Sequence, residues 1–150
     1  MLIHQLERAG EVLRAYRDYV DEGPDELATA LALFPAPPEP FIPEHLQGKT
    51  VLGIIACHCG ELEVGKRVVG PLKGVGAPAV DLVGPMPYTE FQALLDPTAP
   101  PEWRWYNTGE HLSGLADQAI EVLTGQRTAG LGSAHPDHRL PPRRRDEPHR

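Results

Sequence analysis

The chain has 150 residues, of which 41% are hydrophobic, and its formal net charge is −7 at pH 7. This length fits one domain with a modest core, and no uncharged apolar run of about 18 residues occurs, so no membrane span is expected. No secretory signal is visible, and the only two cysteines lie too close together for a disulfide framework, so a reducing, cytoplasmic setting is expected.

The charge is unevenly distributed along the chain. Residues 1–126 carry 8 Lys or Arg against 18 Asp or Glu, whereas residues 127–150 carry 6 Arg against 3 acidic residues. The acidic body, with a net charge of −10, argues against nucleic-acid binding. The Pro- and Arg-rich segment 127–150 has no apolar periodicity, so we expect a disordered tail.

Hydrophobic periodicity predicts the first elements in chain order. A short apolar run opens the chain, and a helix follows that ends at Gly23-Pro24. Its apolar face contains Ala9, Val12, Leu13, Tyr16 and Val20. The stretch LATALALFPAP, residues 27–37, alternates leucine or threonine with alanine and closes with prolines, which favours a strand.

The next elements follow a proline-rich connection over residues 35–49, which we expect on the surface. The stretch TVLGIIACHC, residues 50–59, predicts a central strand. Residues 60–76 have helical period and end in glycines, and residues 78–88 predict a fourth strand.

Two further helices are predicted towards the end of the body. Thr89 begins a short helix, with Gln92 at the spacing of a capping box. The second helix covers residues 114–125, with Leu115, Ala116, Ala119, Ile120 and Leu123 on one stripe. The whole order predicts an α+β fold of the ferredoxin-like β-α-β-β-α-β type: an antiparallel sheet with helices on one face, extra C-terminal helices and a disordered tail.

The triplet Cys57-His58-Cys59 contains three soft ligand types in a row. Because side chains alternate along a strand, both sulfurs should lie on one side and the imidazole on the other. No second cysteine pair exists to complete a tetrahedral zinc site, and the C-x-x-C redox spacing is absent. We therefore favour small buried cysteines at a strand end, and a metal or thiol site is the alternative.

The sequence contains no common nucleotide-binding or hydrolase motif, but it contains a cluster of aromatic residues. The chain contains no G-x-x-x-x-G-K-[ST], G-x-G-x-x-G or G-x-S-x-G motif. Trp103, Trp105, Tyr106 and Tyr88 hold most of the Trp and Tyr content of the chain. They form either one side of the core or an aromatic wall against a flat ligand or a second domain.

Two segments carry a resemblance to a known family: LERAGEVLRAYRDYV, residues 6–20, and DLVGPMPYTEFQALLD, residues 81–96. Over roughly residues 2–126 the chain resembles bacterial FAD-linked oxidases of the vanillyl-alcohol oxidase superfamily, on the berberine-bridge-enzyme-like side. The resemblance implies that residues 1–126 are part of the α+β substrate-binding domain of a flavoprotein oxidoreductase. That domain follows an FAD-binding domain in the family.

The resemblance also implies what this chain does not carry. The family's FAD-binding domain, with the histidine that can hold covalent flavin, has no counterpart here, so we expect FAD not to bind this chain alone and the chain to be a truncated or frame-shifted product. The family commonly has Lys-Ser-x-Tyr after an aromatic strand, but Thr108, Gly109 and His111 stand at those positions. Tyr106 keeps the aromatic character.

The sequence thus supports two main hypotheses. In the first, the chain covers the flavin of an FAD-dependent oxidoreductase and is inactive alone, with Tyr106, Trp105 and Tyr88 near the substrate. In the second, it is a non-enzymatic ferredoxin-like domain that binds a partner or forms a homo-oligomer through its sheet face. No catalytic residue, no cofactor-binding residue and no metal ligand is assigned.

Overall fold

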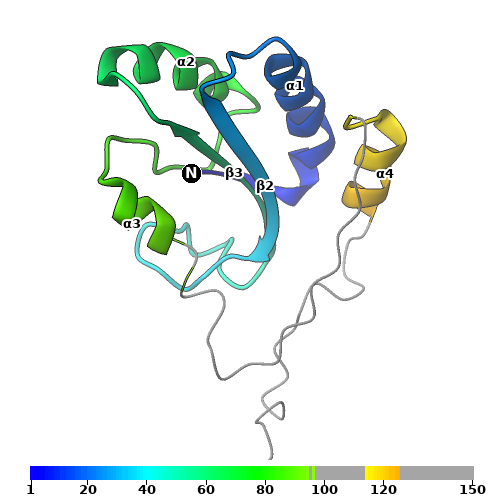
Figure 1. Ribbon diagram of the computed structural model, residues 1–150. Coiled ribbons are helices and arrows are strands. Elements are labelled where there is room, and N and C mark those ends of the chain that lie inside the picture. The colour runs from blue at the N-terminus through cyan, green and yellow to red at the C-terminus, as the bar shows by residue number, and fades with distance from the viewer. Residues whose placement is uncertain (95, 97–113, 126–150) are drawn as a thin grey trace, which may run out of the picture. The chain divides into compact units, whose positions relative to one another are not determined.

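The computed structural model describes residues 1–94, 96 and 114–125 (Figure 1). The chain divides into two units: Met1–Pro85 with Leu112–Leu131, and Met86–His111 with Gly132–Arg150. In the described part of the chain, no helix has both the length and the apolar character needed to cross a membrane. The predicted tail, residues 127–150, lies outside the described residues.

The first unit is built on a four-stranded antiparallel sheet. Its elements in chain order are β1 (Leu2–Gln5), α1 (Ala9–Asp21), β2 (Leu27–Pro35), β3 (Thr50–His58), α2 (Leu62–Gly74), β4 (Val80–Asp81) and α4 (Asp117–Gly125), with a short 3₁₀ turn at Leu6–Arg8 before α1. The spatial order of the strands is β2-β3-β1-β4, and every neighbouring pair is antiparallel. The prediction of mixed helices and strands around an antiparallel sheet is confirmed.

The register between β2 and β3 assigns each side chain to a face. Leu31 lies opposite Ile54, whereas Ala30 lies opposite Ile55. Because opposed residues point to the same side of an antiparallel pair, the leucines of β2 share one face and its alanines the other. This is the alternation that the sequence predicts.

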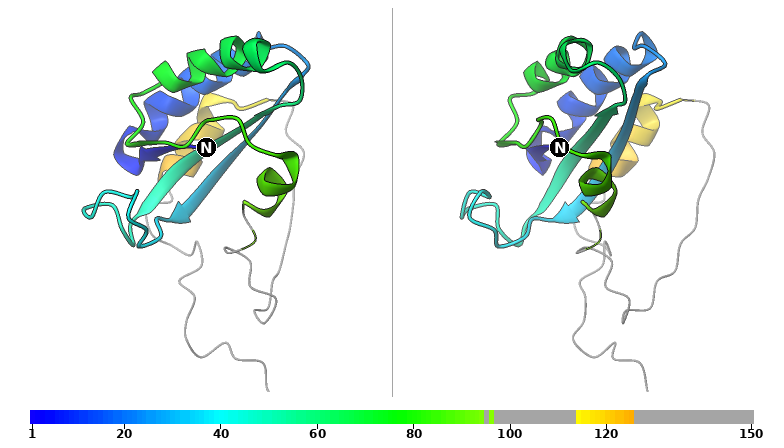
Figure 2. Two further views of the ribbon diagram at one scale, coloured as in Figure 1. Left: turned by 90° about the vertical axis from the view of Figure 1, so that its left-hand side faces the viewer. Right: turned by 60° about the vertical axis from the view of Figure 1, so that its left-hand side comes forward.

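The leucine face of the sheet is covered by helices. Figure 2 shows α1 and α2 on the same side of the strands. The buried side chains of this layer are Leu2, Ala9, Val12, Leu13, Tyr16, Leu52, Ile54, Leu72 and Ile120. Burial of each Leu, Ile or Val side chain contributes about 1.5–3 kcal/mol, so this layer is the main core. Val20, predicted on the buried face of α1, is only partly buried.

Two tyrosines of α1 fasten the helix layer to its neighbours. The Tyr16 hydroxyl lies 2.7 Å from Oγ1 of Thr29 on β2, and the Tyr19 hydroxyl donates to the carbonyl of Val68 on α2. Both phenol oxygens therefore have partners where the rings enter the core.

The connection between β2 and β3 is more buried than its composition predicts. Ala36, Ile42 and Leu46 are buried with Ile3 and Val51 on the alanine face of the sheet. The backbone closes this loop with hydrogen bonds between Ala36 N and Lys49 O at 2.9 Å and between Gly48 N and Ala36 O at 2.8 Å. The expectation of a surface connection is therefore wrong for these three buried residues, which cover one end of that face, whereas Phe41 of the same loop is exposed.

Strand β4 is much shorter than the predicted stretch of residues 78–88. It contains only Val80–Asp81. Leu82 still donates its N–H to the carbonyl of Met1 at 2.9 Å, and the next N–H, that of Val83, donates to the Asp81 carboxylate at 2.9 Å in a local contact. The same carboxylate also lies 3.0 Å from the Lys73 ammonium of α2.

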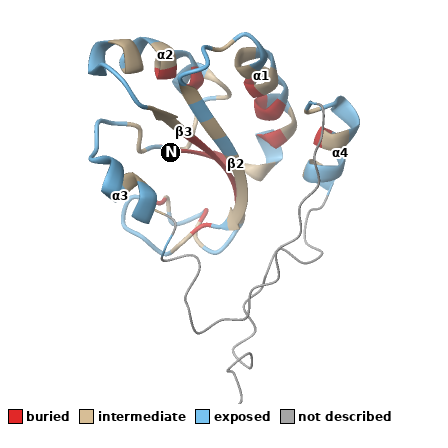
Figure 3. Ribbon diagram, in the orientation of Figure 1, coloured by how far each residue is buried: buried red, intermediate tan, exposed pale blue. Residues whose placement is uncertain are grey.

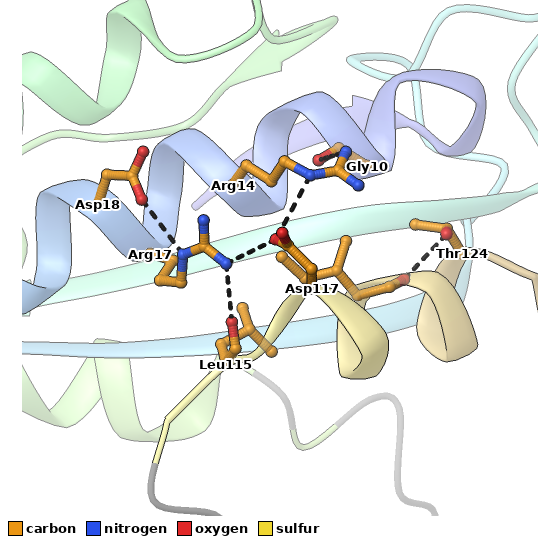
Figure 4. Close-up of polar contacts among 8 residues, drawn as sticks. Gly10, Arg14, Arg17, Asp18, Leu115, Asp117 and Thr124 are labelled. Atoms are coloured by element: carbon orange, nitrogen blue, oxygen red, sulfur yellow. Dashed lines mark hydrogen bonds and ion pairs between the residues drawn. The ribbon is translucent and has the colours of Figure 1, made fainter.

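Helix α4 packs onto α1 through both apolar and polar contacts. Ile120 is fully buried in the main core. Figure 4 shows Arg17 beside Asp117, with Nη1 and Oδ1 2.8 Å apart, and the same guanidinium donates to Leu115 O at 3.2 Å. Leu115 was predicted to be helical, but it precedes the first turn, where its carbonyl accepts from Arg17.

The second unit contains α3 (Tyr88–Ala93). The predicted capping box of Thr89 and Gln92 is wrong, because no side chain caps this helix and its first turn starts one residue earlier. The carbonyl of Pro87 accepts the N–H of Phe91 at 3.1 Å, so Pro87 takes the N-cap position.

Candidate functional site

The two cysteines lie together at the end of β3. Cys57 pairs with Ala28 on the alanine face of the sheet, and its Sγ is 3.7 Å from Sγ of Cys59. Both thiols are free; Cys57 is half-buried and Cys59 is exposed. The prediction that the two sulfurs share one side is confirmed, but the expectation of buried cysteines is wrong for Cys59.

His58 lies on the opposite side of the strand, under the first turn of α2. A methyl group on Gly65 would come 3.2 Å from its Nδ1, and one on Gly60 would come 2.7 Å from its Cε1. The ring therefore fits only because these two positions carry no side chain. Nδ1 is buried and has no hydrogen-bond partner among the described residues. His58 is thus a packing residue between β3 and α2.

The geometry separates the imidazole from the thiols. Among residues 1–94, 96 and 114–125, no group of three or more His, Cys, Asp or Glu side chains is placed to hold a metal ion. Burial, and then the neighbouring Cys59 thiol, raise the pKa of Cys57 above its ordinary value, so its nucleophilic thiolate form is disfavoured. The more accessible thiol is that of Cys59.

A second histidine is buried beside the main core and belongs to no sequence motif. His4 is 1% exposed, and neither ring nitrogen makes a hydrogen bond of normal geometry within the described part of the chain. Burial lowers its pKa most, the backbone of Gly76 opposes this shift, and the charge of Arg8 adds to it. The signal was alternation, which puts His4 on the same face of β1 as Leu2.

The alanine face is left open beyond the loop that covers one end of it. We call Ala28, Ala30 and Cys57 the open face; Ile55, on the same side of β3, is buried. Ala28 and Ala30 are exposed on the edge strand β2, opposite Cys57 and Ile55. Figure 3 shows that residues of β2 are more exposed than those of β3. The surface is small, apolar and uncharged.

Phe34 covers the same end of the alanine face as the loop, opposite Val51. Its ring lies over Gly53, where a methyl group would come 2.7 Å from Cε1. The glycine in the central strand therefore provides the space for this aromatic ring, which packs with the cluster that contains Val51.

Of the three predicted substrate contacts, only Tyr88 lies within the described residues. It is exposed at the start of α3, and its ring stacks on Phe91 with centroids 6.2 Å apart and planes at 20°. Trp105 and Tyr106, together with Trp103, lie outside the described residues, as do the family departures at residues 108–111. That Tyr88, Trp105 and Tyr106 lie together near a substrate stays a prediction.

The described residues do not fit the dinucleotide portion of FAD. A pyrophosphate is normally held by a glycine-rich turn at a helix N-terminus. Gly76 has positive φ, but it packs against Val12 and His4 in the core. Helix α2 begins after Glu61 and has Glu63 in its first turn, so carboxylates occupy the end where a phosphate would bind.

A scan of the chain against models of known protein families gives no match, and a search of curated proteins gives no significant relative. The resemblance to FAD-linked oxidases therefore depends on the residues quoted for it, above all residues 6–20 and 81–96.

Proposed function

We propose that residues 1–126 form part of the substrate-binding domain of an FAD-dependent oxidoreductase of the vanillyl-alcohol oxidase superfamily, on the berberine-bridge-enzyme-like side. The two family-like segments, residues 6–20 and 81–96, support this assignment. The strand order β2-β3-β1-β4, with α1 between β1 and β2 and α2 between β3 and β4, supports the ferredoxin-like type of α+β fold.

The observation that carries the proposal is the asymmetry of the sheet. Helices bury its leucine face, whereas the open face presents the exposed Ala28 and Ala30 beside the half-buried Cys57. Small apolar side chains without charge suit a flat contact with another domain. In this proposal, a separate FAD-binding domain covers the open face.

The chain would contribute binding surface rather than reacting groups. Tyr88, Trp105 and Tyr106 are the aromatic side chains proposed to contact a flat substrate. Oxidation of an alcohol-like or amine-like carbon is the chemistry of a flavin held by the other domain, and no step of it is assigned to this chain. The isolated chain is therefore expected to be inactive.

A binding experiment tests this proposal. The FAD-binding domain of a berberine-bridge-enzyme-like oxidase, expressed without its substrate domain, is titrated with the chain while flavin fluorescence is recorded. We expect saturable binding that A30K weakens at least about tenfold, because a lysine would put a charge into an apolar contact. E63K adds a lysine on the exposed side of α2 and should bind like the wild type.

Two kinds of result would overturn the proposal. One is the absence of binding by the wild-type chain, or equal loss of binding in both lysine variants. The other is a purified chain that is yellow with bound FAD and oxidises a substrate by itself, because the flavin would then not need a second domain.

The second candidate function is non-enzymatic self-association through the sheet, by its open face and the adjoining edge strand β2. It is favoured by the position of β2, a nine-residue strand at the edge of the sheet, where unpaired backbone groups can pair with a second copy. Size-exclusion chromatography with light scattering distinguishes the two candidates. A wild-type dimer that A30K converts to monomer supports self-association, whereas a wild-type monomer argues against it.

A further inference from the structure

Two thiols approach each other at the junction between β3 and α2. The Sγ atoms of Cys57 and Cys59 are 3.7 Å apart, both are free, and at least Cys59 is open to solvent. We propose that Cys57 and Cys59 form a reversible dithiol–disulfide pair that is oxidised by exchange with a small-molecule disulfide. This inference does not depend on the proposed oxidoreductase function.

The backbone around the two cysteines allows the sulfurs to close the remaining distance. A disulfide needs a separation of about 2.05 Å, so one side chain has to move. Cys57 is held by its pairing with Ala28. Cys59, in contrast, follows the last residue of β3 and precedes the start of α2 at Leu62. The movement therefore falls on Cys59, which has no strand partner.

The reaction takes place in two exchange steps. The Cys59 thiolate attacks one sulfur of the small-molecule disulfide RSSR, forms a mixed disulfide and releases RS⁻. The Cys57 thiol then loses its proton, and its thiolate attacks Sγ of Cys59 and displaces the second RS⁻. The protein dithiol has lost two electrons and two protons, and RSSR has become two RSH.

The surroundings of the two thiols give them different roles. The exposed Cys59 can reach a disulfide in solution, whereas Cys57 is half-buried and burial keeps its pKa above the ordinary value. Thiolate fraction and access both govern the rate of exchange. Cys59 is therefore the attacking thiol, and Cys57 is the resolving thiol that acts once a mixed disulfide lies beside it.

The product would be a labile disulfide rather than a structural one. A bridge between residues separated by one position closes a very short loop, so it constrains the unfolded chain little. Strained or exposed disulfides have less negative reduction potentials and are easily reduced. This combination suits a reversible modification of the β3–α2 junction.

The first test follows oxidation by mass. The reduced full chain is incubated with glutathione disulfide, unreacted thiols are trapped with N-ethylmaleimide, and intact mass is measured over time. The wild type should lose two hydrogen atoms, take up no maleimide and keep no glutathione. C57S should retain glutathione on Cys59, and C59S should react several-fold more slowly. Far-UV circular dichroism checks that both variants are folded.

Other product patterns would refute the pair. A wild-type chain that retains glutathione on Cys59 as stably as C57S has no resolving thiol within reach. Accumulation of disulfide-linked dimers, or glutathione on both cysteines, would likewise show that the intramolecular step does not occur.

The second test measures proximity without oxidation. Phenylarsine oxide binds two nearby thiols in one complex and is released from a single thiol by excess monothiol. The wild type should retain one equivalent through a wash with 2-mercaptoethanol, and C57S and C59S should lose it. Retention by either single-cysteine variant, or loss by the wild type, would contradict the proposed pair.

Discussion

Removal of the side chain of Ile120 tests whether α4 belongs to the main core. Ile120 is fully buried against α1 and the sheet, and Ile120→Ala deletes three carbon atoms there. Such large-to-small changes cost about 2–5 kcal/mol. Because α4 is a short helix at the edge of the core and can shift inward, we expect about 2–3 kcal/mol. With a urea slope of about 1–3 kcal/mol/M, the unfolding midpoint falls by about 0.7–3 M.

A matched control lies on the same helix. Val122 is 56% exposed, so Val122→Ala should change the free energy of unfolding by less than about 0.5 kcal/mol. Urea unfolding of both variants is followed by far-UV circular dichroism and by tyrosine and tryptophan fluorescence. A loss below about 0.5 kcal/mol for Ile120→Ala would refute the packing of α4 in the core. So would equal losses for the two variants.

Three further predictions follow from polar groups and from close packing. The pKa of His4 is lowered mainly by burial, so the unfolded chain binds more protons, and stability should fall as the pH decreases below about 6.5, the ordinary histidine value. Urea midpoints between pH 7.5 and pH 5 should therefore decline less in His4→Gln than in the wild type, and equal slopes would contradict this. Gly53→Ala should cost about 1–3 kcal/mol because the new methyl group meets the Phe34 ring; the cost should shrink in the background Phe34→Leu, and additive losses in thermal unfolding would argue against the contact. The hydrogen bond from Arg17 lowers the pKa of Asp117, so the stabilisation by this exposed carboxylate is present above its ordinary pKa of about 3.9 and is lost as the pH falls through its lowered value. Asp117→Asn should lower the urea midpoint only slightly at low salt and not at high salt, and a large salt-independent loss would contradict the exposed ion pair.

The strands and the main helices could be predicted because their burial repeats along the sequence. Alternation placed Leu31 and Ala30 on opposite faces, and the helical period found the buried stripe of α1. The elements that differ from prediction end or begin at local contacts that leave no periodic signal. Just past β4 the Asp81 carboxylate accepts the N–H of Val83, and Pro87 starts α3 ahead of the predicted cap.

The geometry of the candidate site could be predicted only for residues within β3, where side chains alternate between the two faces. Alternation separated His58 from the two sulfurs, but it could not give the 3.7 Å distance between Cys57 and Cys59, because Cys59 lies beyond the strand. It also could not show that Gly60 and Gly65 make room for the His58 ring. That fit depends on how α2 folds back onto β3.

The loop between β2 and β3 shows a similar limit. Its prolines and charged residues predict an exposed connection, yet Ile42 and Leu46 fold back onto the sheet. Isolated apolar residues in a polar segment carry no periodicity, so their burial depends on where the loop returns.

Hydrogen exchange tests most directly the claim that the open face of the sheet receives an FAD-binding domain. Amide exchange of the full chain is measured with and without the FAD-binding domain of a berberine-bridge-enzyme-like oxidase. If the open face receives that domain, exchange slows at residues 27–32 of β2 and 55–58 of β3, with α2 unchanged. Slower exchange over α1 and α2, with β2 unchanged, would place the contact on the helical face and contradict the account.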